Sequence, residues 1–154
     1  LNDDDVNFKT EPESNSVAMI VKHMSGNMLS RWTNFLVEDG EKEWRHRDQE
    51  FEETIHNKID LMATWEKGWA CLFEAIDPLT DADMDRIAYI RNEGHSVIEA
   101  INRQLGHYAY HCGQLVFIVK HFHRRLVALV EQLYNVFVLM YQSIHKSSGA
   151  SGKI

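Results

Sequence analysis

The sequence predicts an all-α protein whose helices form an antiparallel four-helix bundle. Apolar residues recur every three or four positions over several long stretches, which is the spacing of an amphipathic helix. Only 8 of the 154 residues are glycine and 2 are proline. Long helices joined by short links pack most simply as a bundle. The length favours a single domain over residues 1–145, with an irregular segment at 1–14 and a flexible tail at 146–154.

The first helix is expected to begin after Ser14-Asn15-Ser16, because these residue types cap helix N-termini. We expect it to end near Asp39-Gly40, since glycine commonly follows a helix end. Its apolar stripe consists of Val17, Ile20, Val21, Met24, Met28, Leu29, Trp32, Phe35 and Leu36.

The second helix is expected to follow a charged loop at 40–48, with Asp48 as its cap. Pro78 should end this helix, because the residue before a proline avoids helical geometry. Further along, Ile87-Ala88-Tyr89-Ile90 is a candidate for a short extended piece. The stripe of the second helix consists of Phe51, Ile55, Ile59, Met62, Trp65, Trp69, Leu72, Phe73 and Ile76.

The third helix should open at Ser96, because Glu99 three residues later completes a capping-box pattern. A helix running on to residue 143 would be about 70 Å long at about 1.5 Å per residue, so we expect a break around His121–Arg125. Residues 126–141 then form a fourth helix that is apolar nearly all round and therefore buried. Its apolar run is shorter than the ~20 residues of a membrane span, so no membrane association is expected.

The net charge indicates which partners to expect, and the cysteine content indicates the location of the protein. The formal net charge is −7, and phosphate contacts need clustered lysine and arginine, so no nucleic-acid partner is expected. The basic cluster at 120–125 is interpreted as a solvated helix end. Cys71 and Cys112 lie far apart in no Cys-x-x-Cys pattern, which favours reduced thiols and a cytoplasmic location.

Two of the nine histidines, His107 and His111, lie four residues apart in the third helix. This spacing puts both imidazoles on one helix face, where they can bind one divalent metal ion together. Two hydrogen-bonded or surface histidines would give the same spacing. The other histidines are weaker candidates for metal ligands. A di-iron bundle, for example, needs two E-x-x-H motifs, and the sequence shows one, at Glu53 and His56.

A third ligand has to come from another helix, and His23 is the best candidate. It lies on a polar flank of the first helix, beside the apolar stripe, which suits a cavity inside a bundle. A solvated face with one partly buried histidine remains the alternative. Three histidines would leave a coordination position open for water or for a substrate, as in catalytic zinc sites. A metal ion lowers the pKa of what binds there, which makes hydroxide or thiolate available near neutral pH.

With these residues in place, the chain resembles the DinB/YfiT-like superfamily of bacterial four-helix bundles. The matching stretches are NSVAMIVKHMSGNMLSRW (15–32), DGEKEWRHRDQEF (39–51) and GHSVIEAINRQLGHYAYHCGQLVFI (94–118). The last is the most specific, because it joins H-x-x-x-H to a Gly-Gln pair. The resemblance implies a metal site made of one histidine from an early helix and two from a later one, here His23, His107 and His111.

Related members include bacillithiol transferases and a mycothiol-dependent maleylpyruvate isomerase, which use a divalent metal to bind a low-molecular-weight thiol. The resemblance therefore implies a stress- or detoxification-related metal-dependent enzyme, of the thiol S-transferase or hydrolase type. Zn²⁺ is the first expectation for the metal, with Ni²⁺ or Fe²⁺ also suited to imidazole. Asn27, Arg31 and Gln114 are candidates to orient a ligating histidine or to bind an anionic substrate. The alternative is a non-enzymatic helical stress or interaction protein with a structural or adventitious metal.

The chain departs from this family pattern at both ends. Fourteen irregular residues stand where the family has a helix before the first histidine, and residues 121–154 do not look like the family's usual ending. Either the helix at 126–141 replaces the missing one or a second copy of the chain completes the bundle. A homodimer is therefore expected.

Overall fold

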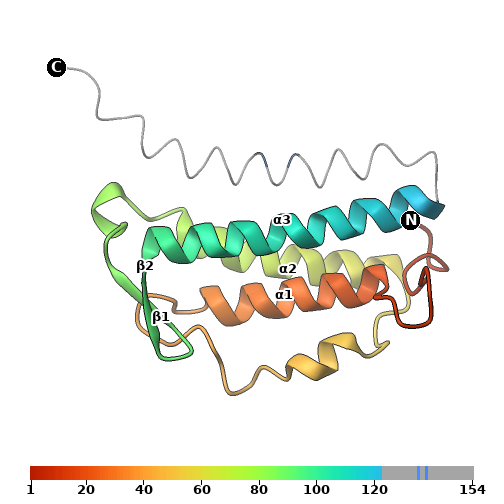
Figure 1. Cartoon of the computed structure of the whole chain (residues 1–154), viewed down its shortest axis with the longest axis horizontal. Helices are drawn as coiled ribbons and strands as arrows, with labels where there is room; N and C mark the ends of the chain where they lie inside the picture. Colours follow the sequence, from red (N-terminus) through yellow and green to blue (C-terminus); the bar gives the residue numbers. More distant parts are fainter. Residues whose placement is uncertain (123–134, 136–137, 139–154) are drawn as a thin grey trace.

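We describe residues 1–122, 135 and 138 in a computed structural model of the chain. The three α-helices lie side by side along the long axis of the molecule, and α3 runs antiparallel to α1 (Figure 1). The all-α prediction is confirmed only as a mostly helical fold, because the described residues also form a two-stranded sheet. An antiparallel four-helix bundle is not confirmed. The first two helices run in the same direction, because the chain between them runs back along the molecule before the second begins (Figure 1). The fourth helix predicted at 126–141 and the tail at 146–154 lie outside the described residues. The elements are α1 (Val17–Trp32), η1 (Arg47–Phe51), α2 (Lys58–Ile76), η2 (Asp81–Asp83), β1 (Ile87–Ile90), β2 (Glu93–Ser96) and α3 (Val97–Phe122), where η denotes a short 3₁₀ helix.

Helix α1 begins as predicted and ends earlier than predicted. The Ser16 hydroxyl accepts a hydrogen bond from the Met19 amide at 3.3 Å, so Ser16 caps the helix. The helix ends at Trp32 and not near Asp39-Gly40, because Thr33 is extended and Asn34 has a left-handed φ of 52°. Asparagine tolerates this conformation better than most residues, and the chain turns there.

The N-cap of helix α2 lies nine residues later than predicted, at Asn57 and not at Asp48. The Asn57 side chain caps it by accepting a hydrogen bond from the Asp60 amide at 2.8 Å. Residues 47–51 form η1, so Phe51 and Ile55 do not belong to the α2 stripe. The end of the helix is as predicted, at Ile76, two residues before Pro78.

The extended piece predicted at Ile87–Ile90 is strand β1, and it pairs with β2 in an antiparallel hairpin. Its two turn residues, Arg91 and Asn92, have φ values of 57° and 62°, as a type I′ turn requires. The Asp39 carboxylate accepts hydrogen bonds from both turn amides, at 2.9 and 2.7 Å. The loop after α1 is therefore fixed to the hairpin.

Helix α3 begins with the predicted capping box. The Ser96 amide donates to the Glu99 carboxylate at 2.8 Å, and the Glu99 amide donates back to the Ser96 hydroxyl at 3.3 Å. The helix is continuous from Val97 to Phe122, and most of the break predicted around His121–Arg125 lies outside the described residues. None of the described helices combines the length and the apolar character that a bilayer crossing needs.

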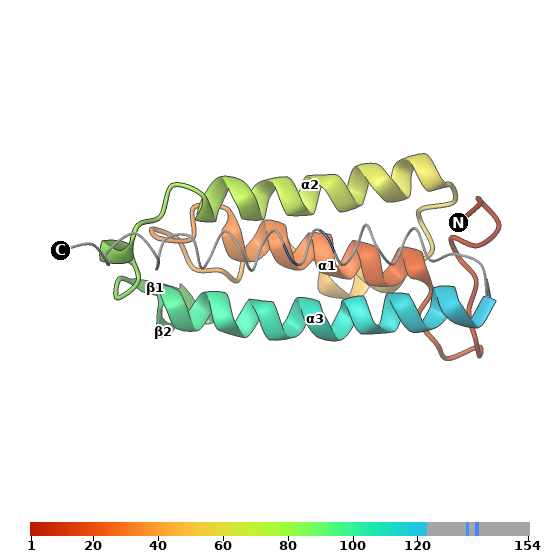
Figure 2. The ribbon, with the colours of Figure 1, turned by 90° about the horizontal axis from the view of Figure 1, so that it is seen from above.

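The core consists largely of buried residues from the three helices, which lie side by side in the view from above (Figure 2). Tyr108 of α3 is fully buried, and its hydroxyl accepts from Trp32 Nε1 at 2.9 Å and donates to Asn27 at 3.2 Å. Helices α1 and α2 approach closely at Gly68, where an added Cβ would lie 2.9 Å from the Cα of Ser25. This packing fixes the rotation of α1, and thereby the side from which its polar residues face α3.

Candidate metal centre

Three imidazoles from two helices converge on one point. His107 Nε2 lies 3.3 Å from His23 Nε2 and 3.1 Å from His111 Nε2, and the ligand atoms of all three lie within 4.8 Å of one another. His23 is 5% exposed, and the other two are half-buried. The structure therefore brings together all three histidines that the sequence singled out.

The outer nitrogens of two of these rings are held by hydrogen-bond acceptors. His23 Nδ1 donates to Glu50 Oε2 at 2.9 Å. His111 Nδ1 donates to Gln114 Oε1 at 2.7 Å, and the amide nitrogen of Gln114 donates to the Tyr110 hydroxyl. A neutral imidazole that carries its proton on Nδ1 presents a lone pair at Nε2. Glu50 and Gln114 thus set the tautomer of their histidines and aim these lone pairs at His107.

This arrangement fits a cation. Two inward lone pairs face the Nε2 of His107, whose buried Nδ1 has no hydrogen-bond partner among the described residues. At most one proton can lie between the three inward nitrogens, so at least one lone pair stays unmatched unless a positive ion is present. Ligand atoms at about 2.0–2.1 Å in a tetrahedral zinc site are separated by about 3.3 Å, close to the two spacings found here.

Glu50 is itself fixed in a buried position. Arg45 binds both carboxylate oxygens, through Nε at 2.8 Å and Nη2 at 3.0 Å, and Glu50 is 8% exposed. Burial raises the pKa of the Glu50 carboxyl, but the hydrogen bonds from His23 and Arg45 outweigh this and bring it below its ordinary value. A Cβ at Gly26 would lie 2.9 Å from Glu50 Cδ, so the glycine in α1 makes room for the carboxylate.

The environment keeps the other two histidines neutral. Burial, followed by the neighbouring imidazoles of His111 and His23, lowers the pKa of His107 to about 4. Burial also lowers the pKa of His111, against the opposing effect of its hydrogen bond to Gln114. A neutral imidazole is the form that binds a metal, so both rings are ready to bind at neutral pH.

The three predicted auxiliary residues have different roles in the structure. Gln114 contacts a candidate ligand, as described above. The side-chain oxygen of Asn27 instead accepts a hydrogen bond from the Tyr108 hydroxyl. The Arg31 guanidinium binds the backbone carbonyl of Gly40 and the carboxylate of Glu41. Within residues 1–122, neither Asn27 nor Arg31 makes a hydrogen bond to any of the three histidines.

The sequence reasoning missed Glu50 and Arg45. The sequence predicts a charged loop at 40–48 and places Phe51 in the second helix, whereas Phe51 lies against His23 with ring centroids 5.2 Å apart. Gly26 was the available signal, because a glycine inside a helix often marks a close approach by another group. Nothing in the local pattern identified that group as the carboxylate of Glu50.

The comparisons with known proteins identify a family but no individual protein that is similar to this chain. The model of a family described as "Protein of unknown function (DUF1572)" matches residues 1–130. No curated protein and no solved structure matches the chain.

Proposed function

The chain belongs to the DUF1572 family, whose model covers most of its length, and we propose that it binds a divalent metal ion through His23, His107 and His111. The observation that carries the proposal is the convergence of three Nε2 atoms, two of which are lone-pair donors because their Nδ1 atoms are hydrogen-bonded to Glu50 and Gln114. Zn²⁺ is the first candidate, and Ni²⁺ and Fe²⁺ suit the same nitrogen donors.

We infer further that the site is catalytic, of the thiol S-transferase or hydrolase type. Three protein ligands leave a coordination position free, and a metal ion there lowers the pKa of a bound thiol or water. Similarity to the DinB/YfiT-like superfamily supports a low-molecular-weight thiol as the co-substrate. In this proposal Glu50 and Gln114 hold their histidines in register, and Phe51 shields the His23 ring from water.

Metal content tests the first part of the proposal. The full-length protein, purified and loaded separately with Zn²⁺, Ni²⁺ and Fe²⁺, should bind about one ion per chain by elemental analysis. The variants His23→Ala, His107→Ala and His111→Ala should lose it. His56→Ala is the matched control, because His56 is exposed and its ring contacts Asn7, far along the chain from the three ligands. Stoichiometric metal in His107→Ala would refute the site.

Turnover tests the second part. The loaded protein should be screened with thiol co-substrates and electrophiles, and separately with esters and amides. Activity that is lost with the metal in His107→Ala supports the enzyme. Metal binding without any turnover would favour a structural role, because the three ligands join α1 to α3. The predicted homodimer is part of this proposal and is measured by light scattering of the loaded protein.

A further inference from the structure

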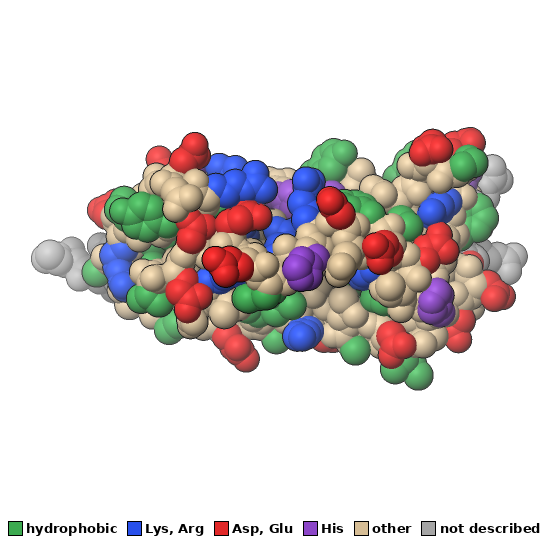
Figure 3. Space-filling model, turned by 90° about the horizontal axis from the view of Figure 1, so that it is seen from below, with side chains coloured by type: hydrophobic (Ala, Val, Ile, Leu, Met, Phe, Trp, Pro, Cys, Tyr) green, Lys and Arg blue, Asp and Glu red, His purple; other side chains and the backbone are tan. Residues whose placement is uncertain are grey.

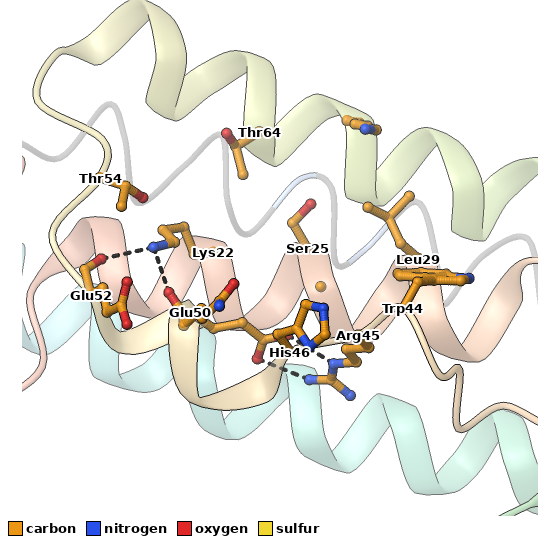
Figure 4. A pocket seen from close by; sticks show the side chains of 13 residues that line it. Lys22, Ser25, Leu29, Trp44, Arg45, His46, Glu50, Glu52, Thr54 and Thr64 are labelled. Atoms are coloured by element: carbon orange, nitrogen blue, oxygen red, sulfur yellow. Dashed lines mark hydrogen bonds and ion pairs between the residues drawn. The ribbon is translucent and has the colours of Figure 1, made fainter.

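A second candidate binding site lies on the other side of Glu50. A pocket of about 450 Å³ opens between α1, α2 and the segment that contains η1. Figure 4 shows Lys22 with Glu52 at one end, and Trp44, Arg45 and His46 towards the other. The volume is within the range of small-molecule sites, about 300–1,000 Å³. The pocket shares the Glu50–Arg45 pair with the metal centre but is not lined by any of the three candidate ligands.

The helix packing creates this pocket. Helices α1 and α2 touch at Ser25 and Gly68, and the α1 stripe of Lys22, Ser25 and Leu29 forms one wall beside this contact. Thr64 and Lys67, three residues apart on one face of α2, form the opposite wall. The 44–54 segment closes the third side.

Positive charge in the pocket is not fully matched by the carboxylates there. The lining includes three cationic side chains, from Lys22, Arg45 and Lys67, against the carboxylates of Glu50 and Glu52. Arg45 and Glu50 neutralise each other. Within residues 1–122, Lys67 makes no ion pair or hydrogen bond. In a chain of net charge −7, a cavity with excess positive charge is distinctive.

Two backbone carbonyls fix the position of Lys22, and the carboxylates of Glu52 and Glu50 act on its charge, so the charge left without a carboxylate in the pocket is that of Lys67. The Lys22 ammonium group donates to the carbonyls of Gln49 at 2.8 Å and Glu52 at 2.7 Å. An ammonium has three donors, so one remains for a ligand. The lining also contains the hydroxyls of Ser25 and Thr54 as neutral donors, whereas the Thr64 hydroxyl donates to the Asp60 carbonyl at 2.8 Å.

The pocket also has an apolar contact surface. Trp44 is 54% exposed, and with Leu29 it lines the pocket. An exposed aromatic ring beside cationic side chains can hold a flat apolar group that carries an anion, because the ring packs against the apolar part and the cations attract the charge. The space-filling view from below shows acidic side chains scattered over this face, and lysine and arginine side chains along part of one edge (Figure 3). The charge of the pocket itself follows from its lining residues.

We propose that this pocket binds a small organic anion, with its carboxylate or phosphate at the lysines and its ring against Trp44. The test uses phenyl phosphate, titrated by calorimetry into the full-length, metal-free protein. We expect saturable one-site binding that weakens with added salt and quenches or shifts tryptophan emission. Inorganic phosphate, which lacks the ring, and benzyl alcohol, which has a phenyl ring but no anion, should both bind at least about tenfold more weakly.

Variants at Lys67 and Trp44 test the location. Lys67→Gln should weaken binding by about two- to fivefold, as expected for one partly exposed charge contact, and Lys67→Glu by about tenfold or more. Trp44→Ala should weaken binding and remove the emission change. Lys120→Gln, at an exposed lysine on α3, is the matched control and should leave binding unchanged.

His107→Ala separates this site from the metal centre, because it should keep phenyl phosphate binding while losing metal. The pocket proposal is overturned by absence of saturable binding, by wild-type affinity in Lys67→Glu, or by loss of binding in His107→Ala. Equal affinity for benzyl alcohol would also overturn it, since the anion would then contribute nothing. None of these outcomes bears on whether the three histidines hold a metal.

Discussion

The hydrogen bond between Glu50 and His23 decides which nitrogen of His23 faces the other two imidazoles. A carboxylate on the outer nitrogen fixes the tautomer and makes the inner nitrogen a stronger donor to a metal. Gln114 fixes His111 in the same way with a neutral oxygen, while His107 has no such partner among the described residues. The three rings should therefore contribute unequally to metal affinity.

Glu50→Gln should weaken metal binding by about 10- to 100-fold, because an amide cannot match the negative charge that Glu50 presents to His23. Competition with a chromophoric chelator measures the change. Glu41→Gln is the matched control, since Glu41 also binds arginines, Arg31 and Arg91, but no histidine of the part of the chain that the structure describes. Wild-type affinity in Glu50→Gln would show that the charge does not act on the site.

The pKa of His107 predicts how the stability of the metal-free protein depends on pH. Burial and the neighbouring imidazoles lower this pKa from 6.5 to about 4. Between these values the unfolded chain binds a proton at His107 that the folded chain does not, so the free energy of unfolding falls as pH falls. Denaturant midpoints measured from pH 7 to pH 4 should show this decline.

His107→Leu removes the titrating group, so its midpoints should decline less over the same range. His56→Ala, at an exposed histidine, should keep the wild-type slope. Identical slopes in His107→Leu and the wild type would contradict the lowered pKa.

At the scale of elements, the position of α1 depends on its close contact with α2. An added methyl group at Gly68 would meet the Cα of Ser25 at 2.9 Å, whereas one at Gly106 of α3 would have no atom of the described residues within 4 Å. The two glycines therefore make a matched pair within helices.

Gly68→Ala should lower the free energy of unfolding by about 1–3 kcal/mol, because the helix backbones have to move apart. Gly106→Ala should raise it by about 0.4–1 kcal/mol, since alanine restricts the unfolded chain and favours helix. Urea denaturation of the metal-free variants measures both. A stabilised Gly68→Ala would mean that the helices are not packed as closely as described.

The predictability of each element follows from the range of the interactions that define it. Local side-chain caps identified the starts of α1 and α3, at Ser16 and Ser96, and the proline at 78 identified the end of α2. The predicted end of α1 was wrong because Asn34 adopts a left-handed conformation in a stretch whose sequence pattern is still that of an amphipathic helix. The hairpin partner of β1 was not identified, since the Asp39 carboxylate that fixes its turn comes from a loop 52 residues away.

The same distinction holds for the site. The spacing of His107 and His111 is local to one helix, and the sequence was sufficient to select both. For His23, the resemblance to the DinB/YfiT-like superfamily favoured the choice of this residue as the third ligand. The network of Glu50, Arg45 and Gly26 requires the 44–54 segment to fold against α1, and no periodic pattern encodes that contact.

At the scale of the whole molecule, metal binding should stabilise the fold, because the folded state alone brings all three nitrogens together. At a free metal concentration one hundred times the Kd, the gain is about 2.7 kcal/mol. This corresponds to a rise in Tm of about 5–10 °C for a chain of this size. Thermal melts with and without metal, followed by a chelator, measure it. A chelator should reverse the rise, and a variant with alanine at all three histidines should show none.

The two ligand-bearing helices are joined by a long stretch of chain, since 84 positions separate His23 from His107. An ion bound between them would act as a reversible cross-link that closes the part of the chain containing α2 and the hairpin into a loop. His107 and His111 lie on adjacent turns, so an unfolded or partly folded chain can capture the ion with this pair first and recruit His23 afterwards. Amide exchange in α1 should then slow on loading, because α1 could no longer detach from α3 without breaking a coordination bond.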